Sequence, residues 1–484
     1  MDFHKGNVYM NMMKISKFGL CLVGALAMSG FAQGDYSGKD LNISFRDKRI
    51  DGFNFSNAKA VKNVTDFQRA AGEKPNFKGA NLSGVSFQNA VISEANFNNA
   101  VLKGVVISGA DIRGSSFEGA DMEEANLYRA TLLDSQFPKT NLKNARLDMM
   151  KVSEETDFSK SDMTMASVNE VDLTRADFSK ANLTNTNFAR SLMANSDFRK
   201  ATLNHTDFTG CNLIAANFKG VDLVDVIFVK AGLSQAEFGG AEFKNVNLQD
   251  ADLSLTTFND VDLSKTQLQR AKFAQSTVKN MEFGKQDLTG VVFDKGSVSK
   301  NNFEKAKLGK ASFYDASVEK NIFKEADLVK SVFDGAYVFK SIFDKADLTK
   351  SNFANSTIER SDFQLAQMSG TSLAGAKLIK VSFLNANLQG VKIDADTKME
   401  DVDFSGADLS NAKIEKFTAK RVLYDNKTKF PKGFDPRQYG FTKPGEKAAE
   451  VVVNKKPQGD KVADDAMPKK KKKKKRKSGF DDED

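Results

Sequence analysis

The acidic residues of this chain recur at a fixed position, and they are the first groups that could do chemistry. Asp177, Asp207 and Asp327 each stand one residue before a large apolar residue, and repeated acids of this kind could act as acid and base pairs. Asparagine fills the same slot at Asn187 and Asn217, and an amide is no proton donor or acceptor of catalytic use. We therefore interpret these acids as residues of a repeat.

The chain has only two histidines, which limits catalysis and metal binding further. His4 lies in an N-terminal segment that ends in an apolar run, and His205 follows the apolar Leu203 by two residues and is expected to face solvent. The sequence therefore offers no histidine dyad, triad or metal cluster, and it contains no phosphate-loop or dinucleotide fingerprint. We predict a protein that is not an enzyme and that uses no cofactor, metal or small-molecule substrate.

Positive charge is concentrated at the C-terminal end. The net charge is +8, of which residues 1–34 contribute +2 and residues 469–484 contribute +5, which leaves +1 for residues 35–468. A block of nine like charges is expected to be a disordered arm that binds anionic lipid, lipopolysaccharide, acidic glycan or nucleic acid. A solubilising tail is the alternative, because acidic residues follow it. Its basic residues are Lys469, Lys470, Lys471, Lys472, Lys473, Lys474, Lys475, Arg476 and Lys477.

Two further sets of basic residues recur every twenty positions, ten residues out of phase with one another. At the spacing of stacked strands, neighbouring charges repel by less than roughly 1 kcal/mol in water, and acidic residues stand close by in sequence. A solvated, self-screened surface is the favoured interpretation, and a binding stripe for a polyanion is the alternative. The first set is Lys300, Lys320, Lys340 and Arg360, and the second is Lys310, Lys330 and Lys350.

Large apolar residues recur every five positions from Phe67 to Ile414, and this period defines the elements that carry the charges. The block Ala80-Asn81-Leu82-Ser83-Gly84 shows the unit: a small residue, Asn or Asp, an apolar centre and two mostly polar residues. A period of five fits neither a helix nor a flat strand, so each unit must turn the chain by a fixed angle.

The register of these centres slips by one residue at two places. Phe158 and Met399 each begin a new register, with Thr156 and Thr397 two residues before them. We interpret both slips as bulges that absorb one extra residue at a corner.

A period of twenty residues lies on top of the short one. Between Phe283 and Phe363 the centres run Phe, Leu, Phe and then Val or Ile, so four pentads make one square coil whose like side chains stack on the next coil. We expect an inward stack made of Phe283, Leu288, Phe293, Val298, Phe303, Leu308, Phe313, Val318, Phe323 and Leu328.

These repeats resemble the pentapeptide-repeat family over about three quarters of the chain. The resemblance implies an all-β fold, a right-handed quadrilateral parallel β-helix with four pentads per coil. It also implies one alternative function, because the best-understood members mimic DNA and protect a type II topoisomerase in the cytosol. Those members are acidic along the rod, whereas this rod is nearly neutral.

The pattern divides the chain into six segments. We expect a signal peptide over residues 1–34, an N-terminal cap with a first irregular coil over 35–66, and the β-helix over 67–416. A C-terminal cap follows over 417–442, where prolines block further strand pairing, then a polar linker over 443–468 and the tail over 469–484.

The N-terminal segment indicates export. Lys14 and Lys17 precede an apolar run from Phe18 to Phe31 that is too short for a membrane anchor, and translation can begin at Met1 or at Met13. Removal of this segment leaves Cys211 as the sole cysteine, in a small inward position where we expect a buried, inert thiol.

The sequence thus predicts an exported protein, periplasmic or secreted, that is a rod-like binding or structural module. Its partner is either another protein or an anionic surface that the tail contacts. The cytosolic topoisomerase-protecting protein stays the alternative.

Overall fold

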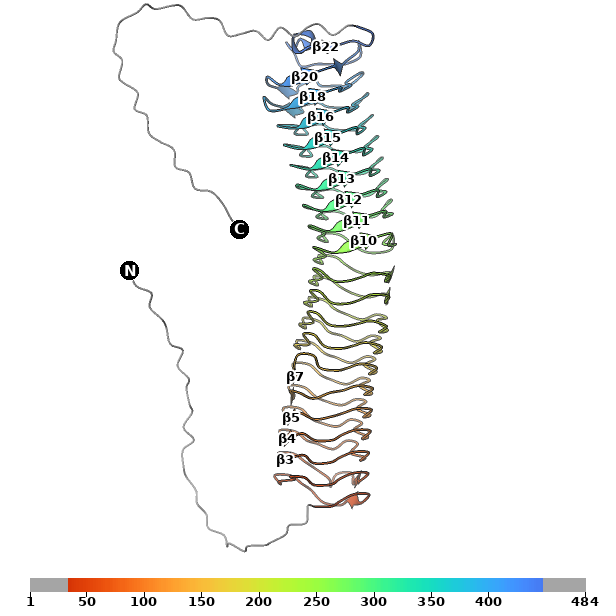
Figure 1. Cartoon of the computed structure of the whole chain (residues 1–484), viewed down its shortest axis with the longest axis vertical. Helices are drawn as coiled ribbons and strands as arrows, with labels where there is room; N and C mark the ends of the chain where they lie inside the picture. Colours follow the sequence, from red (N-terminus) through yellow and green to blue (C-terminus); the bar gives the residue numbers. More distant parts are fainter. Residues whose placement is uncertain (1–33, 447–484) are drawn as a thin grey trace, which may run out of the picture.

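The computed structural model describes residues 34–446, which form one long rod of stacked coils (Figure 1). The N-terminal coils lie at one end of the rod and the C-terminal coils at the other (Figure 1). The predicted signal peptide up to residue 33, most of the linker and the polybasic tail lie outside the described residues. None of the described residues belongs to a helix with the length and apolarity that a membrane span requires.

The strands are short and every strand pair is parallel, so the prediction of an all-β parallel β-helix is confirmed. One sheet contains nine strands, β10 (Thr257–Asn259), β11 (Thr277–Lys279), β12 (Ser297–Ser299), β13 (Ser317–Glu319), β14 (Tyr337–Phe339), β15 (Thr357–Glu359), β16 (Lys377–Ile379), β18 (Lys398–Glu400) and β20 (Thr418–Lys420). A second contains β3 (Ala71–Glu73), β4 (Val91–Ser93), β5 (Asp111–Arg113), β6 (Thr131–Leu132) and β7 (Lys151–Val152).

Four strand pairs and one 3₁₀ helix complete the described elements. The pairs are β1 (Asp40–Leu41) with β2 (Lys59–Ala60), β8 (Asp222–Val224) with β9 (Glu242–Lys244), β17 (Lys392–Ile393) with β19 (Lys413–Ile414), and β21 (Val422–Leu423) with β22 (Phe441–Thr442). The 3₁₀ helix is η1 (Pro436–Tyr439). Elsewhere, isolated parallel bridges join residues of successive coils.

Each coil has four sides, and each pentad forms one side. We number the sides by their centres in one coil: side 1 carries Val298, side 2 Phe303, side 3 Leu308 and side 4 Phe313. Residues twenty apart are paired, as in Val298 with Val318, so like positions stack in columns parallel to the rod axis.

The chain turns at a residue two positions after each centre, where the backbone is left-handed. Lys300 has a φ of 58° and Lys310 a φ of 61°. This conformation costs an L-residue about 1–2 kcal/mol. Burial of the next apolar centre offsets this cost, because the turn directs the chain onto the next side of the coil.

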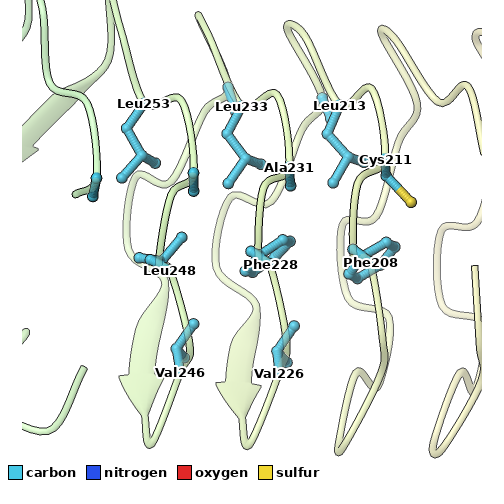
Figure 2. Close-up of a cluster of buried hydrophobic side chains, with 14 of the residues drawn as sticks. Phe208, Cys211, Leu213, Val226, Phe228, Ala231, Leu233, Val246, Leu248 and Leu253 are labelled. Carbon is cyan, nitrogen blue, oxygen red and sulfur yellow. The ribbon is translucent and has the colours of Figure 1, made fainter. Parts of the chain in front are cut away.

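The core is a column of side chains that runs the length of the rod. All ten residues of the predicted inward stack, from Phe283 to Leu328, are at most 1% exposed. The ring of Phe323 stacks on Phe303 at 4.9 Å and on Phe343 at 4.7 Å, which is the spacing of adjacent strands. Figure 2 shows the same columns of like side chains around Phe208 and Phe228.

The six-residue units place their extra residue in the turn, and a threonine closes it. The hydroxyl of Thr156 donates to the carbonyl oxygen of Ser153 at 2.6 Å, and that of Thr397 donates to the carbonyl oxygen of Leu373 in the preceding coil at 3.0 Å. Thr428 repeats the second arrangement with the carbonyl oxygen of Phe404 at 3.1 Å. Each of these hydroxyl groups thus satisfies a backbone carbonyl oxygen, as Thr140 and Thr186 do in ordinary five-residue units.

Aromatic side chains cover both ends of the core. At the N-terminal end the ring of Tyr36 stacks on Phe55 at 5.4 Å. At the C-terminal end strand pairing continues beyond residue 416, because β20 pairs with β18, although the pentad pattern stops at Ile414. The ring of Phe417 then stacks on Tyr439 of η1 at 4.9 Å and covers the last coil.

Three of the four sides lose parallel bridges between successive coils over residues 237–287. Among the described residues no bridge joins Glu237 to Thr257 on side 1, and Asp262 has no bridge on side 2. On side 3 none joins Gln267 to Asp287, whereas side 4 stays paired through Lys272. A cavity of about 520 Å³ opens beside β9. We call this stretch, residues 237–287, the interruption.

Candidate functional site

The repeated acidic residues hold the turns of the coil. Oδ1 of Asp177 accepts a hydrogen bond from the backbone N–H of Ser179 at 2.7 Å, and Asn187 accepts the equivalent bond from Ala189 at 2.9 Å. Asp207, Asp327, Asn217 and Asn247 do the same. Such side-chain caps of the turn require an oxygen acceptor and no charge, which explains why Asp and Asn interchange.

The histidine and the cysteine of the described residues do not form a reactive centre. His205 lies at an exposed corner, with Nδ1 3.7 Å from a carboxylate oxygen of Asp225. Cys211 is buried, its thiol donates to the carbonyl oxygen of Phe188, and burial raises the pKa of the thiol to about 12. Figure 2 shows Cys211 within the packed core. Residues 34–446 contain no group of three or more His, Cys, Asp or Glu that could hold a metal ion.

The structure places the two sets of basic residues on opposite corners of the rod. Lys300, Lys320, Lys340 and Arg360 stand at the corner between sides 1 and 2. Lys310, Lys330 and Lys350 stand at the corner between sides 3 and 4. All seven side chains are exposed.

The first corner continues much further than the sequence period suggested. The column of centres on side 1 runs through stacked rings from Phe137 to Phe258 and then pairs with Val278. Residues two positions after these centres share the corner, and five more of them are basic. We call the whole set the basic edge: Lys139, Lys160, Lys180, Lys200, Lys300, Lys320, Lys340, Arg360 and Lys380.

A search for a strict twenty-residue period misses the lower part of the basic edge, because the extra residue at the first slip places Lys139 and Lys160 21 residues apart. Counting two positions beyond each apolar centre, in place of a fixed twenty, would have found the lower part of the edge. The middle of the same corner carries no basic residue, since Gly220, Gly240, Asp260 and Asn280 occupy it.

Few acids neutralise the basic edge. Within the described residues, Lys139 pairs with Glu118 at 2.6 Å and Arg360 with Glu359 at 3.3 Å, and the other seven members form no ion pair. The side chain of Glu319, next to Lys320, accepts a hydrogen bond from Ser317. The edge therefore presents a row of basic side chains, most of which form no ion pair with a described residue.

The opposite corner is more nearly neutral. Arg190 pairs with Glu170 at 2.7 Å and Arg270 pairs with Asp250 at 2.6 Å. In the upper half of the rod, the basic residues of this corner that form no ion pair with a described residue are Lys310, Lys330 and Lys350.

The chain matches models of one repeat family. A model described as a pentapeptide repeat region matches residues 161–238, and one described as pentapeptide repeats (8 copies) matches residues 76–109, 107–144, 236–275 and 366–394. Together with the four-sided coil, these matches establish that the chain is a pentapeptide-repeat protein.

Solved structures of other repeat proteins are similar in fold. HetL, a pentapeptide repeat protein involved in heterocyst differentiation regulation from the cyanobacterium Nostoc sp. strain PCC 7120, is 18% identical, with 49% of this chain and 89% of HetL covered and a TM-score of 0.24. QnrB1, a plasmid-mediated fluoroquinolone resistance protein, is 20% identical, with 44% and 89% covered and a TM-score of 0.24.

A pentapeptide repeat protein from the Arabidopsis thaliana thylakoid lumen is 26% identical over 21% of this chain and 64% of that one, with a TM-score of 0.15. No curated protein matches the chain. These likenesses concern the fold.

Proposed function

We propose that this pentapeptide-repeat protein is an exported, non-enzymatic rod that serves as a binding or structural module. The proposal rests on the structural roles of the repeated side chains: the inward apolar residues fill the core, and the repeated acids and amides cap the turns. Enzymes gather convergent polar groups in a recess. The described rod instead offers long sides and corners, which suit a partner that lies along it.

Export is supported by the N-terminal sequence. Basic Lys14 and Lys17, followed by the apolar run that ends near Ala32, have the order of a secretory signal peptide. Cleavage should leave a mature chain that begins between about Gln33 and Tyr36. Cell fractionation and sequencing of the mature N-terminus test this. An intact Met1 or Met13 terminus in the cytosol would refute export and favour the topoisomerase-protecting alternative.

The tail, Lys469–Lys477, is proposed to contact an anionic surface. Binding to vesicles that contain phosphatidylglycerol should fall steeply with salt, because association releases condensed counterions. Deletion of residues 469–484 should abolish vesicle binding and leave thermal unfolding unchanged. A matched control replaces the nine basic residues by serine at constant length. Full-length protein that ignores these vesicles at low salt would show that the tail only solubilises the chain.

A further inference from the structure

The basic edge is built for exposure, which is the first requirement of a binding surface. Each member occupies a corner with a left-handed backbone, as at Lys320 with a φ of 57° and Lys340 with a φ of 48°. The inward residues on either side of the corner, such as Val318 and Phe323, are fully buried. The packed core therefore fixes where each charged side chain leaves the rod, and ordering the edge for a ligand costs little backbone entropy.

The spacing of the edge is regular because coils stack at a constant rise. The upper run, Lys300 to Lys380, has five basic residues on five successive coils. With a rise of about 4.8 Å per coil, these residues span about 19 Å along the axis. Neighbouring charges repel one another, and a row of anions at a similar repeat would relieve all these repulsions together.

The surroundings of the edge favour a carboxylate polymer over nucleic acid. Eight of its nine members are lysines, point charges that pair with carboxylate and phosphate oxygens alike, so the distinction rests on the aromatic side chains and on the spacing. Proteins that bind single-stranded nucleic acid also stack bases on aromatic side chains. Along the strands that precede the upper run, the aromatic side chains that are not buried are Tyr337 and Phe339, which stack on each other at 5.9 Å. Phosphates of duplex DNA recur every 3.4 Å along each strand, which is closer than the rise of the coils.

We propose that the upper run of the basic edge, Lys300 to Lys380, binds an extended acidic polysaccharide that lies parallel to the rod axis. A polyuronate carries one carboxylate on each sugar, so it offers a regular row of anions to a regular row of lysines. The inference deepens the proposed function, on which it rests for access to such polymers outside the cell. The middle of the corner, from Gly220 to Asn280, carries no basic residue and separates this run from the lower one.

The two corners of the rod supply a matched test in the full-length chain. The edge variant carries Lys320→Glu, Lys340→Glu and Arg360→Glu. The control variant carries Lys310→Glu, Lys330→Glu and Lys350→Glu. Both have the same net charge, both alter exposed left-handed corners in the same half of the rod, and both keep the tail. Affinity for polygalacturonate is measured at several salt concentrations, with dextran as the neutral polymer and single-stranded DNA as the competing polyanion.

We expect the edge variant to bind polygalacturonate at least about tenfold more weakly, with a shallower salt dependence, and the control variant to change by less than about threefold. Equal losses in both variants, or no loss in either, would overturn the inference. Binding of single-stranded DNA that exceeds polygalacturonate binding and depends on the same edge would assign the surface to nucleic acid and refute the polysaccharide. Lys320→Gln, Lys340→Gln and Arg360→Gln give a milder second edge variant, whose fold is checked by circular dichroism.

The outcomes separate this inference from the proposed function. A cytosolic chain with an intact N-terminus that still binds polygalacturonate through the edge would refute export alone. A secreted chain whose edge and control variants bind equally would refute the edge alone.

Discussion

Replacing Gln286 by alanine should stabilise the interruption. Gln286 occupies a small inward position on side 3, where Ala306 and Ala326 stand in the following coils. Its Nε2 donates to the carbonyl oxygens of Leu263 at 2.8 Å and Thr266 at 2.6 Å. In an intact coil the carbonyl oxygen equivalent to that of Thr266 accepts a backbone hydrogen bond, as the carbonyl oxygen of Ala306 does from Asp327 N–H at 3.0 Å. The glutamine side chain therefore takes the place of backbone pairing.

The change in local stability can be estimated from the hydrogen bonds that the substitution removes and restores. Alanine removes two side-chain hydrogen bonds, and restored pairing would return two backbone bonds, from Asp287 N–H and Leu268 N–H, of about 1 kcal/mol each. These terms nearly cancel. Oε1 of Gln286 is buried and has no hydrogen-bond partner within the described part of the chain, a penalty of about 1–3 kcal/mol that alanine removes. We expect a net local stabilisation of about 1–2 kcal/mol.

Amide hydrogen exchange measures this change where it occurs. In the parent chain, peptides that cover residues 257–287 should exchange faster than peptides that cover 297–347, because local opening follows lost pairing. In Gln286→Ala their exchange should slow by about 5–30-fold. Ala326→Gln, in the same column of an intact stretch, is the reciprocal control and should speed local exchange. Faster exchange in Gln286→Ala would show that the glutamine holds these coils together and would refute the reasoning.

Three further predictions concern the core, the thiol and acid stability. Phe323→Ala should destabilise the rod by about 3–5 kcal/mol in urea unfolding, and Phe323→Asp by more, whereas the neighbouring exposed Ile322→Ala should cost under about 0.5 kcal/mol; equal effects would mean that the inward assignment is wrong. Cys211 should resist a soluble disulfide reagent in the native chain and react fully in urea, because its pKa is about 12 and its thiol is buried; rapid native labelling would contradict this. Stability should fall between about pH 4 and pH 2, because the pKa of Asp408 is lowered from an ordinary 3.8 to about 2 in the folded chain: burial acts to raise it, but hydrogen bonds from Ser410, Gln389 and Lys429 outweigh burial. The folded carboxylate thus stays charged at a pH where the unfolded one is protonated. Asp408→Asn should flatten this part of the profile of melting temperature against pH, and an unchanged profile would count against the assignment.

The repeat could be predicted because its determinants are local. A five-residue unit with small and large apolar residues two apart already specifies one side of a coil, as Ala306 and Leu308 show, and the twenty-residue period specifies which centres stack. The role of the repeated acids also followed from sequence, since Asp177 and Asn187 occupy one slot and make one kind of bond. Burial of Phe283 to Leu328 is the consequence of this local code.

Two features depend on which coils meet, and sequence spacing alone does not give them. The extra turn residue near Thr156 moves Lys139 and Lys160 out of the twenty-residue period, and only stacking of Phe137 on Phe158 returns them to one corner. The interruption depends on hydrogen bonds from the side chain of Gln286 to carbonyl oxygens of the preceding coil, at Leu263 and Thr266. The sequence by itself determined the coil and its core, because each pentad folds by short-range rules. The tertiary structure decided the basic edge and the break in pairing, because both arise from contacts between coils.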